Sequence, residues 1–205
     1  MVKRDFYTGI YWELLYLCFN KFKFKMEKKI SPAKSGLLFG ILFGVIMVLE
    51  FVIMYIIGMK SLVGTSVGMI VNVTNYLILP FLFIFIGCNN YKKNINNGFI
   101  SIGECLKTGV SITFIAALIY AVFSIVFNLI FPEFMDEMLS ISKSEMIKTT
   151  PNITSEQLEL GLGMIKKFMN PFIVFPATLA MYSFFGLIYS LIVGLIVKNE
   201  NPQSL

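Results

Sequence analysis

The sequence has no histidine, and only 14% of its residues are charged. Without histidine, a Ser/His or Cys/His catalytic pair, an H-E-x-x-H zinc site and histidine ligation of haem are excluded. The three cysteines, Cys18, Cys88 and Cys105, are too scattered for a disulfide framework or a C-x-x-C metal site, and we interpret them as inert. There is also no P-loop or G-x-G-x-x-G motif. The sequence therefore predicts no catalytic residue, no metal ligand and no cofactor.

Hydrophobic residues are abundant instead: they form 57% of the 205 residues, and the mean hydropathy is +0.78. They occur in runs long enough for a helix of about 20 residues to cross the hydrocarbon core. The predicted fold is an all-α integral membrane bundle of four transmembrane helices, at residues 36–57, 69–88, 108–131 and 171–197.

The flanking charges predict an orientation. Lysines crowd the chain before the first helix, and Lys92, Lys93 and Lys107 lie between the second and third helices. Because basic loops stay in the cytoplasm, both termini are predicted to be cytoplasmic. The chain then divides into a basic cytoplasmic segment (1–33), a four-helix membrane domain (34–198) with an outer segment (132–170), and a cytoplasmic tail (199–205).

Two interpretations of residues 1–25 stay open. The stretch is aromatic, and its alternating Lys and Phe at 21–25 suit an interfacial anchor. Alternatively, Met26 is the natural start and residues 1–25 are an upstream extension.

The outer segment carries helix-start signals. Thr154 and Gln157 form a capping box, as do Ser101 and Glu104 before the third helix. Beyond Thr154, apolar residues fall on one helical face: Leu158, Leu162, Ile165 and Met169. A second stripe holds Met135, Met138, Ser142 and Met146. We expect two short amphipathic helices that lie on the membrane surface or cap the bundle.

Glu50 is the one charged residue within the four predicted spans. A carboxylate in hydrocarbon is costly, so it is usually paired, solvated or protonated. At the helical rise it lies about 10 Å below the outer edge, with Asn75 and Thr178 at similar depth and Asn72 and Asn128 at about 5 Å. We call these five residues the polar layer. Two interpretations remain. The polar layer is either an ion, proton or small-ligand site, or a set of interhelical hydrogen bonds in a dry bundle. The lack of a second charged residue in the spans favours the hydrogen-bonding interpretation.

Small residues repeat at four-residue spacing on two of the predicted helices. These small faces allow close helix approach and are expected to serve packing within the chain rather than dimerisation. They consist of Gly36, Gly40 and Gly44 on the first helix, and of Gly186, Ser190 and Gly194 on the fourth.

Several short stretches resemble the bacterial domain of unknown function 4199 family: GFISIG at 98–103, AALIY at 116–120, FPEFM at 131–135 and Asn170-Pro171. The resemblance covers about residues 27–198. It implies a small four-span protein of the bacterial inner membrane and no functional residues.

The sequence thus favours a non-enzymatic accessory or assembly component of the inner membrane. Its expected partners are the lipid bilayer and either another membrane protein or a second copy, with no nucleic acid. The alternative is a small transporter or channel in which Glu50 titrates.

Overall fold

The computed structural model describes residues 30–200, and in this part of the chain four helices are long and apolar enough to cross a membrane. This confirms the predicted all-α bundle of a membrane protein. The first span is α2 (Pro32–Ile57), the third is α6 (Ile102–Ile130) and the fourth is α9 (Pro171–Val197). The second runs through α4 (Ser66–Val73), the π-helix η1 (Thr74–Ile78), α5 (Leu79–Asn90) and the π-helix η2 (Tyr91–Ile95), and so exceeds its predicted bounds.

Several predictions concern the two ends of the chain and lie outside the described residues. They are both interpretations of residues 1–25, the position of Cys18, and most of the basic segment 1–33 and of the tail 199–205.

Helix α6 is the centre of the bundle, and it contacts α2 along one side and α9 along another. A Cβ atom built on Gly36 would lie 2.7 Å from Thr108 O, and one on Gly40 would lie 2.8 Å from Ile112 O. The predicted small face of α2 therefore lies directly against the backbone of α6. The two helices run parallel in constant register, because each four-residue step on α2 matches a four-residue step on α6.

Helix α9 packs against α6 in the opposite direction. Gly186 lies against Thr113, Gly194 against Cys105, and Ser190 against Gly109 of α6. Ser190 and Thr113 are fully buried and donate hydrogen bonds to carbonyls of their own helices, so no polar side chain is left unsatisfied at this contact. The small faces of both helices thus meet α6 within the chain.

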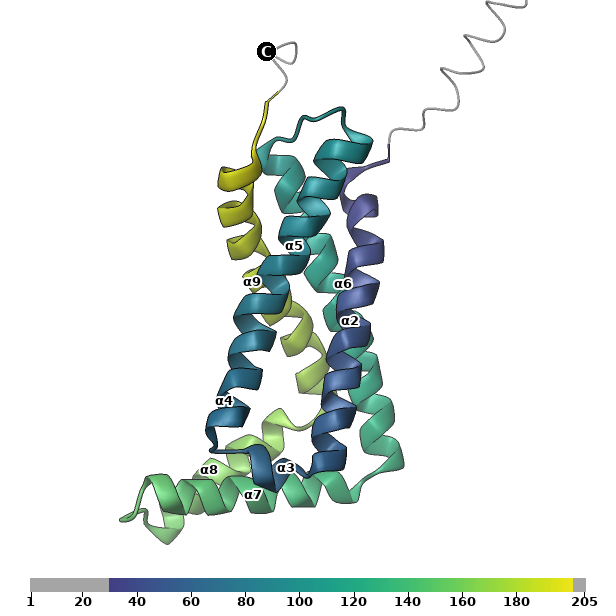
Figure 1. Cartoon of the computed structure of the whole chain (residues 1–205). Coiled ribbons are helices and arrows are strands. Elements are labelled where there is room, and N and C mark those ends of the chain that lie inside the picture. Colours follow the sequence, from purple (N-terminus) through teal and green to yellow (C-terminus); the bar gives the residue numbers. More distant parts are fainter. Residues whose placement is uncertain (1–29, 201–205) are drawn as a thin grey trace, which may run out of the picture. The chain divides into compact units, whose positions relative to one another are not determined.

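The helices α7 (Glu133–Thr149) and α8 (Ser155–Phe168) lie across one end of the bundle, near the short α3 (Met59–Leu62) (Figure 1). The two predicted amphipathic helices are thereby confirmed, as are both capping boxes. Phe134 and Ile141 of α7 are buried in a cluster with Phe127 of α6 and Met59. Helix α7 is therefore anchored on the ends of α2 and α6.

The predicted apolar face of α8 is also observed. Leu158, Leu162, Ile165 and Met169 are half-buried, whereas Glu156, Glu159, Gly163 and Lys166 on the opposite side are exposed. On α7, the half-buried stripe of Met135, Met138, Ser142 and Met146 flanks the more deeply buried Phe134 and Ile141.

Glycine substitutions test the close approach of α2 and α6. Gly40→Ala would place its Cβ 2.8 Å from Ile112 O and is expected to destabilise the folded chain by about 1–3 kcal/mol. Gly163→Ala, which meets nothing within 4 Å, is the matched control and is expected to stabilise α8 by at most about 1 kcal/mol. Unfolding in mixed detergent micelles measures both, and equal stability of the two variants would contradict the tight α2–α6 contact.

A candidate ligand cavity at the α7–α8 end

A partly open cavity of about 690 Å³ lies at the end of the bundle that α7 and α8 cover. Its walls come from α2, from the loop that contains α3, from α4 and η1, and from α6 and α9. The polar lining residues are Thr65, Ser66, Asn72, Asn75, Tyr76, Tyr120, Thr178 and Tyr182. The volume falls in the range of about 300–1,000 Å³ that is usual for small-molecule sites.

Three residues of the predicted polar layer, Asn72, Asn75 and Thr178, line this cavity. Glu50 is half-buried beside it, and its carboxylate lies near enough to the Asn75 side chain of η1 for the two groups to interact electrostatically. The structure thus brings four of the five predicted residues together.

Asn128 is the residue that the structure keeps apart. Its Nδ2 donates to Ser124 O of its own helix at 2.8 Å, and its Oδ1 is buried without a hydrogen-bond partner among the described residues. The parallel register of α2 and α6 explains the separation: it places Tyr120, rather than Asn128, near the level of Glu50. Asn128 is level with Ile56, roughly 9 Å further along the helix axis.

Sequence reasoning missed two sets of lining residues. The first is aromatic: the rings of Tyr76 and Tyr182 have their centroids 6.1 Å apart, and Tyr120 packs edge-on against Phe51 at 6.2 Å. The second is a set of methionines: Met47, Met54, Met59, Met69 and Met181. Because so many residues of the chain are apolar, the sequence does not distinguish these lining residues from core residues. The register between the helices is needed to identify them.

The cavity exists because the second span diverges from the bundle. Helices α4 and η1 bury no residue, whereas α5 buries Pro80, Ile84, Gly87 and Cys88. The change occurs at Pro80, which has no N–H to donate to the Tyr76 carbonyl one turn earlier. Tyr189 of α9 donates its hydroxyl to that carbonyl instead, at 2.7 Å. This bond holds η1, and with it Asn75 and Tyr76, at the cavity wall.

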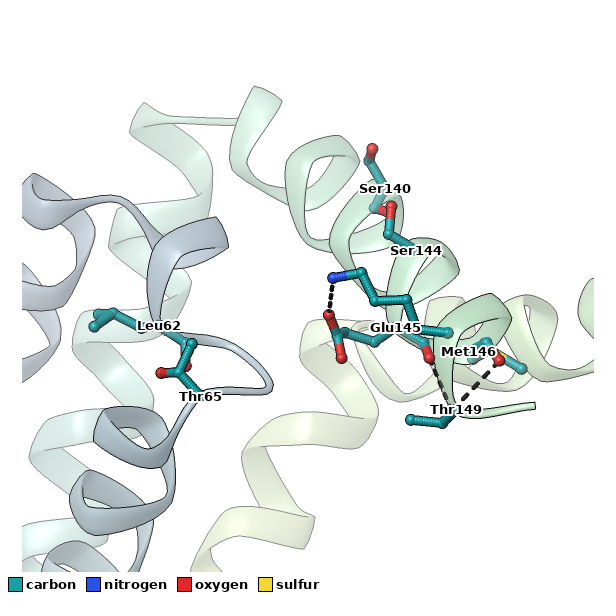
Figure 2. Close-up of polar contacts among 8 residues, drawn as sticks. Leu62, Thr65, Ser140, Ser144, Glu145, Met146 and Thr149 are labelled. Carbon is teal, nitrogen blue, oxygen red and sulfur yellow. Dashed lines mark hydrogen bonds and ion pairs between the residues drawn. The ribbon is translucent and has the colours of Figure 1, made fainter. Parts of the chain in front are cut away.

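A loop and α7 form the outer rim. Thr65 caps α4 by accepting a hydrogen bond from Gly68 N at 3.3 Å, and it donates to Leu62 O at 2.7 Å. Figure 2 shows Glu145 of α7 opposite this loop. A Cβ on Gly64 would lie 2.5 Å from Glu145 Oε2, so the carboxylate touches the loop backbone. Lys148 forms an ion pair with Glu145 at 2.8 Å and partly neutralises it. The G-x-S-x-G sequence at 64–68 therefore shapes the rim of the cavity.

At its other end the bundle is closed by polar contacts. Lys92 Nζ donates to Val197 O at 2.8 Å, and the Tyr91 hydroxyl donates to Glu104 at 3.2 Å. A short β-bridge joins Ile100 to Asn199. The small residues Thr108, Thr113 and Ser190 are fully buried below these contacts.

The lining itself carries no charged side chain, because it contains no Lys, Arg, Asp or Glu. The nearest carboxylates are Glu50, beside the cavity wall, and Glu145 at the rim, which is paired with Lys148. In residues 30–200, no group of three or more potential metal-ligating His, Cys, Asp or Glu residues is found. The arrangement can bind a molecule with an apolar body and a polar or positively charged group.

A family model described as "Protein of unknown function (DUF4199)" matches residues 38–199, and so includes the cavity, most of the first span and the other three spans. No curated protein and no solved structure matches the chain.

The hydrogen bond from Tyr189 to Tyr76 O tests the origin of the divergence. Tyr189→Phe is expected to destabilise the chain by about 0.6–1.5 kcal/mol, as for other single hydrogen bonds in membrane proteins. In a Pro80→Ala background, where residue 80 regains its N–H, the same substitution is expected to cost less. Unfolding free energies of the four proteins form a double-mutant cycle, and additive effects would contradict the proposed link between Pro80 and Tyr189.

Proposed function

The chain belongs to the DUF4199 family of proteins of unknown function, and we propose that it acts without catalysis as a small membrane transporter that binds its ligand in the cavity. The observation that supports this proposal most is the cavity itself. A dry bundle with Glu50 in a purely structural role has no need of a space of about 690 Å³ beside that residue.

The composition of the walls supports binding of a ligand with both apolar and polar parts. Five methionines offer flexible, polarisable side chains that adapt to different shapes. Asn75 and Thr178 add hydrogen-bonding groups, and Glu50 adds a titratable group. Binding at this end is the first step of transport, and carriage to the other side requires the closed end to open.

The proposed location is the bacterial inner membrane, with both termini and the closed end in the cytoplasm. Lys92, Lys93 and Lys107 gather at the closed end, as the preference of basic residues for the cytoplasmic side requires. The cavity then faces outward, under α7 and α8. The side from which a membrane-impermeant thiol reagent reaches a cysteine in the cavity tests this orientation.

A second candidate function, partner binding as an accessory component, is favoured by an apolar stripe on α8. Leu160, Met164 and Phe168 are 59%, 62% and 66% exposed. Helix α8 ends next to the start of α9, where Phe172 is 89% exposed, so lipid covers this stripe as readily as a protein does. The cavity therefore remains the stronger support for a function.

Filling the cavity tests the proposed function. We expect the full-length protein in detergent to bind the neutral fluorescent probe N-phenyl-1-naphthylamine, and Thr178→Trp to weaken that binding roughly tenfold, about 1.4 kcal/mol, by occupying the space. Leu187→Trp is the matched control, because it introduces the same side chain on the same helix at a residue that is 44% exposed and does not line the cavity. Absence of binding to the unaltered chain, or equal binding by both variants, would refute the proposal.

A further inference from the structure

The cavity has hydrogen-bond acceptors on its walls and the Glu50 carboxylate beside them, in an otherwise apolar space. Glu50 has no ion-pair partner in the described part of the chain, where the one ion pair joins Lys148 to Glu145 on α7. None of the lining residues is basic. A bound ligand that carries a positive charge would therefore supply the counter-ion that the protein leaves out.

Asn75 offers the cavity a hydrogen-bond acceptor, its side-chain Oδ1. The residue lines the cavity from η1, beside Glu50. The Oδ1 atom of Asn75 is buried and has no hydrogen-bond partner among the described residues. A buried acceptor without a partner costs about 1–3 kcal/mol, and a ligand N–H or a cationic group beside it removes the penalty.

The aromatic walls also suit a cation. Tyr76, Tyr120 and Tyr182 line the same cavity from three different helices. The face of an aromatic ring carries partial negative charge and attracts ammonium-type groups within about 6 Å, more strongly where water is excluded. The methionine sulfurs add polarisable contacts for the apolar part of such a ligand.

From this combination we propose that the ligand is a lipophilic organic cation, with Glu50 as its counter-ion, the three tyrosines around its charge and the methionines around its apolar groups. The inference rests on the proposed function and specifies its substrate class. A bare metal ion fits poorly, because hard cations need six or more oxygen ligands at short distance and most of this lining is carbon and sulfur. An anion fits poorly because it would face Glu50 without a basic partner.

Two probes of the same size and opposite charge test the proposal on the unaltered chain. Tetraphenylphosphonium is expected to displace N-phenyl-1-naphthylamine from the full-length protein in detergent, whereas tetraphenylborate is expected to displace it at least roughly tenfold less effectively. Equal displacement by the two ions, or better displacement by the borate, would overturn the inference while leaving the cavity as a binding site. Failure of the neutral probe itself to bind would overturn the proposed function as well.

Substitutions then assign the charge to Glu50. Glu50→Gln is expected to weaken tetraphenylphosphonium binding at least roughly tenfold more than it weakens binding of the neutral probe. Glu159→Gln, which removes the same charge from the exposed face of α8, should leave both unchanged. Glu50→Asp keeps the charge and should retain measurable selectivity for the phosphonium. Wild-type affinity of folded Glu50→Gln for the phosphonium would exclude Glu50 as the counter-ion.

Discussion

The close approach of α6 to α2 and α9 is the contact on which the rest of the structure depends. Lipid does not drive helices together as water does, so association relies on backbone proximity and on packing between small side chains. Gly36 and Gly40 place α2 against the carbonyls of α6, and Gly186 places α9 against Thr113. These contacts fix both registers and thereby decide which side chains meet further along the bundle.

The backbone contact between α2 and α6 extends over only part of the bundle. Past the last small residue of α2, Gly44, the positions that line the cavity are the bulky Met47, Phe51 and Met54, and the helices meet there through large side chains. Pro80 interrupts the second span, and the part of this span that precedes it, α4 and η1, buries no residue. Helix α7 packs on the ends of α2 and α6 through Phe134. A cavity beside Glu50 follows from these three features together.

Periodicity and charge were enough to predict the four spans, the two outer helices and both capping boxes, because each depends on neighbours within about four residues. Depth along each helix predicted that Glu50, Asn75, Thr178, Asn72 and Asn128 all lie in the outer third of the spans; of these, Asn72, Asn75 and Thr178 line the cavity and Asn128 does not. Depth ignores the register between helices, and that register places Tyr120 near Glu50 instead. The π-helix before Pro80 and the bond from Tyr189 depend on contacts between distant parts of the chain and could not be predicted from local pattern.

The proposed outward cavity above a closed helical contact can be tested by thiol accessibility in whole cells. In a background without Cys18, Cys88 and Cys105, Thr178→Cys lies at the cavity wall and Ser190→Cys lies in the buried contact with α6. An impermeant methanethiosulfonate added outside the cells is predicted to label Thr178→Cys, and to label Ser190→Cys only after denaturation. Protection of both cysteines, or labelling of both in the folded protein, would contradict this account.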